Sequence, residues 1–396
     1  MPQPLLRVGF LNSHPIQYAA PLYAYLAQSG EVTPVALYLT DFSIRGGFDK
    51  QFGRKITWDT NLLSGYEHHF VGKNYASAEP YGFFALKGDG IKQKLVELSL
   101  DALVVHGHNF LAMNRAVAAA RALSIPVFYK GETHLGLPRS PLKSALRRPA
   151  MAALFSQMTG FLAISQRNKD YYRSFNIAED RIFDFPYTVE NDRLIAASTM
   201  SEDERRKQLE ELGLRSDLPV VIYASKFMHR KHPDDLIAAC ALLQQRGEKL
   251  QLLFVGTGDM ESELRDLAAK HPALPVVFAG FQNQSQLPRI LGASDIFVLP
   301  SENEPFGLII NEAMCAGLPI VAAEEIGSVP DLVLQDRNGR VFDAGDISGL
   351  ADALQPLVGD AELRRAMGQE SLKIIGRWSF ARNLAGMRQV VSSLSV

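Results

Sequence analysis

Short apolar runs alternate with helix-like segments along most of this chain, and this alternation restricts the fold more than any other feature. In the first half the runs fall at residues 6–11, 34–38, 102–105, 126–129 and 160–164. In the second half they recur at residues 220–224, 252–255, 276–279, 296–299 and 320–322. Strand-length runs separated by helices are typical of parallel sheets that are covered on both faces. The pattern predicts an α/β protein with two doubly wound, Rossmann-like domains facing across a cleft.

The composition is that of an ordinary soluble protein. A length of 396 residues suits two domains, and 47% of the residues are hydrophobic against 21% charged. No run reaches the ~18 apolar residues of a membrane span, and the N-terminus lacks the basic start and apolar core of a secretion signal. Cys240 and Cys315 lie in apolar, helix-like contexts and are expected to be buried free thiols. We therefore expect a cytoplasmic protein, and a net charge of −2 argues against a dedicated nucleic-acid binder.

The segment after the run 296–299, SENEPFGLIINEAMCAGLP at residues 301–319, has the residues of a ligand-binding turn. Pro305 suits the entry of a helix, and Gly317 and Pro319 suit its end. The first N–H groups of such a helix attract anions, so the backbone of Phe306, Gly307 and Leu308 is a candidate phosphate site. Glu304 and Glu312 are hydrogen-bond acceptors suited to sugar hydroxyls on either side of a diphosphate. Alone, this pair also fits a surface glutamate and a helix-face glutamate.

Glu304-Pro-Phe-Gly307 with Glu312, followed by Ala316-Gly-Leu-Pro319, resembles the E-x7-E signature of retaining GT-B glycosyltransferases of family 4. The resemblance is tight over residues 295–320, covers most of 101–378 and is loose before 100. It implies that Glu312 accepts hydrogen bonds from the nucleotide ribose and that Glu304 contacts the donor sugar. It also implies a front-face reaction assisted by the leaving phosphate, with no side-chain nucleophile.

A basic loop follows the run 220–224, where the family places Arg and Lys five residues apart. The matching positions are Lys226 and Lys231, with Arg230 beside them. Fixed cations at a strand end can stabilise a leaving diphosphate without a metal. Lys in place of Arg loses the bidentate contact to phosphate. A solvated basic turn is the alternative reading of these residues.

Other segments match the family pattern in part. Gly256-Thr-Gly258 resembles its Gly-x-Gly turn, and Phe281 follows the run 276–279 like the residue that packs on the nucleotide base. The glycine-rich loop expected after the first run is missing, and His14 and Gln17 are instead polar candidates for the cleft.

The residues after the runs 102–105 and 126–129 depart further from the family. We expect His106 to be a hydrogen-bonded core residue, and His108 to line the cleft or to serve the core equally well. Glu132 occupies the position where family members carry a histidine, and His134 follows two residues later. A carboxylate there can orient a donor hydroxyl or accept the acceptor's proton. A salt bridge between Lys130 and Glu132 is the alternative.

Three segments fit the alternation less well. Residues 43–90, rich in Gly and aromatics, form a candidate acceptor-binding or lid region, with an elaborated loop as the equal alternative. Residues 138–148 form a basic stretch that suggests weak peripheral membrane contact. The alternative is a surface helix whose solvent-exposed face is basic. The charged segment 193–218 reads as a linker with a solvated helix. We predict an acceptor-side domain at residues 1–195, a donor domain at 196–378, and a last helix at 379–396 that packs back on the first domain.

These features together favour a metal-independent, retaining glycosyltransferase. It would move a hexose-type sugar from a UDP- or GDP-sugar to a hydroxyl acceptor, in glycan, glycolipid or envelope polysaccharide synthesis, with no cofactor beyond the donor. An epimerase or hydrolase of sugar nucleotides on the same fold, and a catalytically silent nucleotide-sugar-binding protein, are the alternatives. A Rossmann dehydrogenase is disfavoured because no G-x-G-x-x-G follows residues 6–11.

Overall fold

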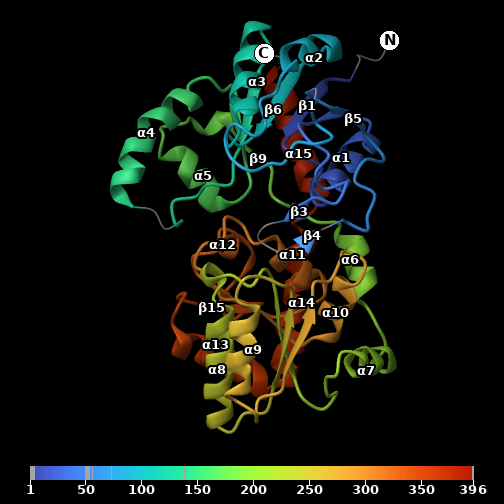
Figure 1. The fold of residues 1–396 in the computed structure, drawn as a ribbon, viewed down its shortest axis with the longest axis vertical. Helices are drawn as coiled ribbons and strands as arrows, with labels where there is room; N and C mark the ends of the chain where they lie inside the picture. The colour runs from blue at the N-terminus through green and yellow to red at the C-terminus, as the bar shows by residue number, and fades with distance from the viewer. Residues whose placement is uncertain (1–4, 50–53, 56, 73, 138–139, 395–396) are drawn as a thin grey trace.

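The structure, a computed structural model, describes residues 5–49, 54–55, 57–72, 74–137 and 140–394. Parts of two segments singled out in the sequence, residues 50–53 with 56 and 73, and residues 138–139, therefore lie outside it. The described chain forms two α/β halves, one above the other in Figure 1. Each half is built on its own parallel sheet, which confirms the predicted GT-B architecture.

The first sheet has seven strands in the order β5-β2-β1-β6-β7-β8-β9, all parallel. Its strands are β1 (Arg7–Asn12), β2 (Thr33–Tyr38), β5 (Glu67–Phe70), β6 (Ala102–His106), β7 (Val127–Lys130), β8 (Gly160–Ala163) and β9 (Ile182–Asp184). A small antiparallel pair, β3 (Phe48–Asp49) and β4 (Arg54–Lys55), lies near the second half of the molecule (Figure 1).

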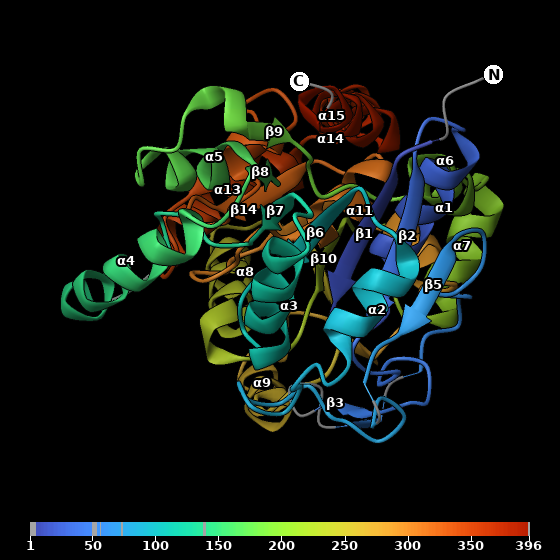
Figure 2. The ribbon, with the colours of Figure 1, turned by 90° about the horizontal axis from the view of Figure 1, so that it is seen from above.

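The helices of the first half cover both faces of this sheet. They are α1 (Ala19–Gln28), α2 (Ile91–Leu98), α3 (Leu111–Ala122), α4 (Pro141–Phe155) and α5 (Gln166–Arg173), joined by the C-terminal α15 (Phe380–Leu394). Side chains alternate along each strand, so one face packs on α1 and α15 while the other packs on α2 to α5. Helix α15 contacts β9 and α1, and Figure 2 shows it beside β9.

The second sheet has six strands in the order β12-β11-β10-β13-β14-β15, again all parallel. Its strands are β10 (Val220–Ala224), β11 (Gln251–Val255), β12 (Val276–Gly280), β13 (Ile296–Leu299), β14 (Ile320–Ala323) and β15 (Gly339–Phe342). Its helices are α6 (Asn191–Ser198), α7 (Glu202–Glu211), α8 (Pro233–Gln245), α9 (Glu261–Ala269), α10 (Leu287–Ala293), α11 (Leu308–Cys315), α12 (Val329–Leu332), α13 (Ile347–Gly359) and α14 (Ala361–Gly376). Cys240 and Cys315 are buried free thiols within this half, as predicted.

Three strands of the two parallel sheets were not predicted, and each is an end strand of its sheet. β5 reads Glu-His-His-Phe, and it is half-buried because its polar side chains are paired, with Glu67 contacting Arg7 and His69 at 2.9 Å. β9 has only three residues, too few to show a period. β15 begins at Gly339 and has only four residues. The preceding Asn338 is buried, with its side chain bonded to the backbone of Leu332 and Leu334.

The predicted linker is helical and packed. Helix α6, which contains residues 195 and 196, lies against α10 and α11. Helix α7 has a capping box between Ser201 and Glu204, and Leu209 anchors it by complete burial. Among the helices within the described ranges, none combines the length and apolarity that a bilayer span requires.

Candidate active site

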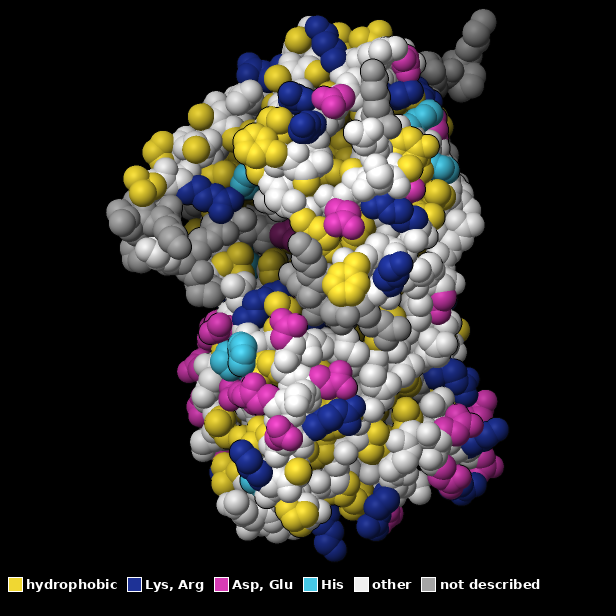
Figure 3. All heavy atoms as spheres, viewed as in Figure 1, with side chains coloured by type: hydrophobic (Ala, Val, Ile, Leu, Met, Phe, Trp, Pro, Cys, Tyr) yellow, Lys and Arg dark blue, Asp and Glu magenta, His cyan; other side chains and the backbone are white. Residues whose placement is uncertain are grey.

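Two cavities lie at the carboxyl ends of the strands, where the two halves meet. The first, here called the Lys231 cavity, has a volume of about 400 Å³ and is lined from the first half by Gln17, Tyr18 and Trp58, and from the second by residues that include Lys226, Arg230, Lys231, Gly256, Phe281, Gln284, Glu304 and Ile309. The second, the Glu132 cavity, has a volume of about 340 Å³ and is lined by residues that include Asn12, Ser13, Ile16, His106, His108, Tyr129, Glu132, Thr133, Arg147 and Pro305. Figure 3 shows a hollow between the two halves on one face of the molecule.

The two cavities adjoin each other along two short segments of chain. Glu304 lines the Lys231 cavity, and the next residue, Pro305, lines the Glu132 cavity. In the same way Ile16 belongs to the Glu132 cavity and Gln17 to the Lys231 cavity. Ligands in the two cavities would therefore lie next to each other, separated by the backbone of consecutive residues.

The basic loop after β10 is joined directly to the loop after β13. The Lys231 ammonium contacts the Glu304 carboxylate, and both side chains are largely buried. The Arg230 guanidinium donates to the backbone oxygen of Asn303 at 2.6 Å, and the Ser301 hydroxyl donates to the backbone oxygen of Arg230 at 3.1 Å. These contacts hold the cations and Glu304 as one unit.

Burial, together with the positive charges of Arg230 and Lys226, lowers the pKa of Lys231 to about 7. The Glu304 carboxylate in contact with its ammonium group opposes this shift. An incoming diphosphate would act in the same direction as Glu304, so an anionic ligand would favour the charged form of Lys231.

Gly256 and Gly307 allow the close approach of loops around the Lys231 cavity. Gly256 has φ = +136°, and a Cβ there would lie 2.1 Å from the backbone oxygen of Ser225. Gly307 has φ = +90°, and a Cβ there would lie 2.9 Å from Ile326. Any side chain at either position would strain the backbone or push the loops apart.

Helix α11 begins at Leu308, directly after Gly307, so the N–H groups of Leu308 and Ile309 have no partner within the helix, while the Ile310 N–H donates to the Gly307 oxygen at 2.9 Å. The side chain of Phe306 does not face the cavity. It is 2% exposed and packs edge-on against Tyr187, with ring centroids 5.4 Å apart. The backbone of this turn, and the side chain of Ile309 in the first turn of the helix, are the parts close to the Lys231 cavity.

Glu312, one turn into α11, is buried just behind the cavity wall. Its carboxyl group accepts hydrogen bonds from Tyr18 and Gln284, which both line the Lys231 cavity. Its Oε1 atom has no hydrogen-bond partner among the described residues. Burial raises the pKa of Glu312 to about 7, although both hydrogen bonds oppose the shift. A buried carboxyl group with one oxygen unused can accept a further hydroxyl group.

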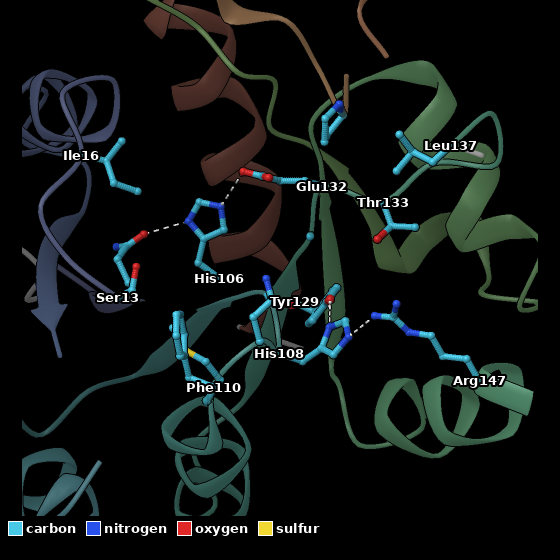
Figure 4. A pocket seen from close by; sticks show the side chains of 16 residues that line it. Ser13, Ile16, His106, His108, Phe110, Tyr129, Glu132, Thr133, Leu137 and Arg147 are labelled. Atoms are coloured by element: carbon cyan, nitrogen blue, oxygen red, sulfur yellow. Dashed lines mark hydrogen bonds and ion pairs between the residues drawn. The ribbon is translucent and has the colours of Figure 1, made fainter. Parts of the chain in front are cut away.

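Glu132 stands at the end of a chain of hydrogen bonds in the other cavity. The Tyr187 hydroxyl lies 2.5 Å from Glu132 Oε1 and 2.7 Å from His106 Nε2. His106 Nδ1 lies 2.8 Å from Asn12 Oδ1. Figure 4 shows the His106 ring joined by a dashed line to Glu132, whose carboxylate is 3.8 Å from Nε2. Glu132 is half exposed, with 52% of its side chain accessible.

The row of hydrogen bonds from Asn12 through His106 and Tyr187 to Glu132 has one hydrogen fewer than its acceptors need. The Asn12 amide donates to Tyr23 and to the backbone of Phe10, so its Oδ1 is an acceptor and His106 Nδ1 carries the hydrogen. Burial lowers the pKa of His106 to about 3, so the ring is neutral and Nε2 is a second acceptor. The single Tyr187 hydrogen then lies between two acceptors, Nε2 and the carboxylate. A proton added to Glu132 would satisfy every atom, because Glu132 would donate to Tyr187 and Tyr187 to His106.

Lys130 does not form the salt bridge that the sequence allowed. Its Nζ lies over the rings of Tyr187 and Phe185, at 4.4 and 5.1 Å from their centroids. Burial lowers the pKa of Lys130 to about 7, and the Glu132 charge opposes the shift.

The remaining histidine candidates have different positions. His108 lines the Glu132 cavity, with Nδ1 2.7 Å from the Tyr129 hydroxyl and Nε2 2.6 Å from the Arg147 guanidinium (Figure 4). His134 is buried, and its Nε2 lies 3.3 Å from the backbone oxygen of Glu304. His14 lies 2.9 Å from the Ser13 hydroxyl and packs edge-on to Phe42, and among the described residues it is not part of either lining.

Several residues at the site were not named as candidates from the sequence, among them Tyr18, Trp58, Tyr187 and Gln284. Tyr18 directly follows Gln17, a predicted cleft residue, so its position shortly after a strand end was a usable signal. The other three lie in loops without a local pattern. The described ranges hold no group of three or more His, Cys, Asp or Glu side chains placed to bind a metal ion.

The sequence of the second half matches a known family. Residues 204–373 match the family model of glycosyl transferases group 1. The chain is 28% identical over 268 residues to the sulfoquinovosyl transferase of Arabidopsis thaliana, covering 64% of this chain and 49% of the relative. It is 27% identical over 307 residues to the D-inositol 3-phosphate glycosyltransferase of Xylanimonas cellulosilytica, covering 72% and 71%. The chain spans about half the length of the first curated relatives it matches.

Solved structures share the whole fold. The crystal structure of Anabaena HepE in complex with UDP and glucose has a TM-score of 0.72 at 18% identity, with 98% of this chain and 100% of HepE covered. WaaG, a glycosyltransferase involved in lipopolysaccharide biosynthesis, has a TM-score of 0.64 at 15% identity, with 93% and 95% covered. The chain thus has the GT-B fold, and residues 204–373 in its second half match the model of glycosyl transferases group 1.

Proposed function

We propose that this protein is a retaining glycosyltransferase that transfers a hexose-type sugar from a nucleoside-diphosphate sugar to a hydroxyl acceptor. The observation that carries the proposal is the adjacency of the two cavities across Glu304 and Pro305. A donor in the Lys231 cavity and an acceptor in the Glu132 cavity would meet at this loop. The group 1 match over residues 204–373 supports the donor half of this assignment.

The Lys231 cavity has the groups that a nucleotide sugar needs. Lys226, Lys231 and the start of α11 suit the diphosphate, since fixed cations and free N–H groups stabilise phosphate oxygens. The unpartnered Oε1 of Glu312 suits a ribose hydroxyl. HepE, which shares the fold, was solved with UDP-glucose, so UDP-hexoses are the first donors to test.

In the reaction, the acceptor oxygen forms a bond to the anomeric carbon of the donor as the bond from that carbon to the diphosphate breaks. The electron pair of the broken bond stays on the diphosphate, where Lys226 and Lys231 stabilise the growing charge. The acceptor proton passes to Glu132, because that proton completes the hydrogen-bond chain through Tyr187 and His106. No side chain needs to act as the nucleophile, and no metal is part of this proposal.

The side chains that line the Glu132 cavity indicate the chemical class of the acceptor. Its wall combines the Arg147 guanidinium and several hydroxyl and imidazole groups with the apolar Ile16, Phe110, Met113 and Leu137. A polar ring with hydroxyl groups, such as a saccharide or a cyclitol, fits such a lining. Synthesis of a glycan, a glycolipid or an envelope polysaccharide is the setting we propose.

The test is turnover of UDP- and GDP-hexoses with the purified chain, with and without a panel of saccharide, cyclitol and lipid-linked acceptors. A glycosidic product that keeps the anomeric configuration of the donor sugar is the expected result. Conversion of the donor without transfer would instead indicate an epimerase or hydrolase. Binding of nucleotide sugars with neither reaction would indicate a silent binding protein.

A further inference from the structure

The segment 57–59 of the first half reaches across to the second half, beside the β3–β4 pair that Figure 1 places at the boundary. Trp58, in the centre of this segment, lines the Lys231 cavity. Phe281, which follows β12 in the second half, lines the same cavity, and the two ring centroids are 6.3 Å apart with an interplanar angle of 53°. One cavity wall is therefore an aromatic pair contributed by both halves.

Hydrogen bonds on both sides of Trp58 fix this placement. The Asn283 amide donates to the backbone oxygen of Thr57 at 2.9 Å. The Ser285 hydroxyl and backbone N–H donate to the Asp59 carboxylate at 2.5 and 3.2 Å. The neighbours of Trp58 are thus anchored to the loop that begins at Phe281.

The spacing of the two rings suits a flat ligand group. One aromatic plane held between two others needs centroids about 7 Å apart, twice the ~3.5 Å optimum for carbon contacts. The observed 6.3 Å is close to this value, and the rings, now tilted by 53°, would become parallel and move slightly apart to hold a base between them. Of the parts of a nucleotide sugar, only the nucleobase is flat and aromatic.

We infer that Trp58 is a nucleobase-binding residue, and that the first half of the chain contributes to binding of the donor as well as of the acceptor. This inference rests on the proposed function. The base stacks between Trp58 and Phe281, while the diphosphate contacts Lys226 and Lys231. Asp59 is a positioning residue that acts on the ligand only through Trp58.

The experiment measures UDP and GDP binding by calorimetry to the wild type and to Trp58→Ala, Trp58→Phe and Phe84→Ala. Loss of one stacked ring should weaken binding of the accepted nucleotide about 10- to 100-fold in Trp58→Ala. Trp58→Phe keeps a ring and should lose much less. Phe84 is an exposed aromatic residue of the first half, outside both linings, so its variant should bind like the wild type.

A ligand without a base separates stacking from general damage to the site. Ribose 5-phosphate should compete for the Lys231 cavity equally well in the wild type and in Trp58→Ala. Equal nucleotide affinity of the wild type and Trp58→Ala would overturn the inference and leave the proposed function standing. Failure of the wild type to bind any nucleotide or nucleotide sugar would overturn the proposed function itself.

Asp59 gives an independent check through a double-mutant cycle. Asp59→Ala should weaken UDP or GDP binding several-fold in the wild-type background, because Trp58 loses an anchor. In the Trp58→Ala background the same change should have no effect. An equal loss in both backgrounds would mean that Asp59 acts on the ligand without Trp58, and would contradict its positioning role.

Discussion

The imidazole of His134 in the first half lies 3.3 Å from the backbone oxygen of Glu304 in the second half. His134 Nδ1 accepts a hydrogen bond from the Gly136 N–H, so Nε2 carries the hydrogen and donates it to Glu304. The same oxygen accepts the Gly327 N–H at 3.0 Å. The loop between the two cavities is therefore held from both halves, and the position of Glu304 depends on how the halves meet.

Glu312 should contribute strongly to nucleotide binding. Because truncation removes a charge-assisted bond to the ribose, Glu312→Ala is expected to weaken binding of the accepted nucleotide by about 1.5–3 kcal/mol. Calorimetry with UDP or GDP measures the change. Unchanged affinity would reject the assignment of Glu312 to the ribose.

Glu312 should lower the free energy of unfolding of the nucleotide-free protein at high pH. Burial raises the pKa of Glu312 from an ordinary 4.5 to about 7. The folded state therefore holds this proton more tightly, so the stability it contributes is full below pH 4.5 and is lost as the pH rises through 7. The neutral Glu312→Gln should exceed the wild type in free energy of unfolding by up to about 3 kcal/mol near pH 8.

Denaturant unfolding near pH 5 and pH 8 checks this difference, which should shrink toward the lower pH. Glu210→Gln, at an exposed position in α7, is the matched control and should give a small, pH-independent difference. A Glu312→Gln difference that does not depend on pH would contradict the expectation.

Lys226 and Lys231 should act mainly in the transition state. Replacing either residue with Ala is expected to lower kcat by roughly 10²-fold or more, with a smaller loss of donor binding, because charge on the diphosphate grows as the bond breaks. Steady-state kinetics and calorimetry on each variant separate the two effects. Equal losses in both would indicate ordinary ground-state binding. Lys231→Ala also leaves Glu304 without its partner, so its melting temperature should be measured alongside.

Glu132 and Tyr187 should act together on the acceptor's proton. Glu132→Gln keeps the shape but cannot accept the proton, so transfer should fall by roughly 10²-fold or more while nucleotide affinity is unchanged. Tyr187→Phe keeps the carboxylate but breaks its link to His106, and should give a smaller loss of kcat. Transfer at the wild-type rate by Glu132→Gln with every accepted donor and acceptor would leave Glu132 without a role in proton transfer.

The fold followed from local patterns in the sequence. Buried parallel strands are short and apolar throughout, so β10 and β13 were located to the residue. The helix after β13 was also predicted from the apolar spacing that starts at Leu308, but its entry was expected at Pro305, whereas α11 begins at Leu308 after Gly307 in the left-handed region. β5 was missed because an edge strand can be polar when its side chains are paired, as Glu67 is with Arg7 and His69.

The roles of individual side chains were less accessible. The resemblance named Glu304 and Lys231 separately, whereas their direct contact appears only when the loops after β10 and β13 lie side by side. The backbone of Phe306 stays a predicted phosphate contact, while the burial of its ring against Tyr187 appears only in the tertiary structure.

By itself the sequence determined the two parallel sheets, the helix that begins after Gly307, and the residue types available at the strand ends. Only the tertiary structure decided which of them meet. Four segments of the first half contribute the hydrogen-bonded residues Asn12, His106, Tyr187 and Glu132. The missing hydrogen among them can be recognised only when the partner of each residue is known. Trp58 lies in a segment without periodicity, and the bonds to Asn283 and Ser285 that place it join residues 226 positions apart. Hydrogen bonds between distant segments form only where folded surfaces meet, so local sequence propensity does not predict them.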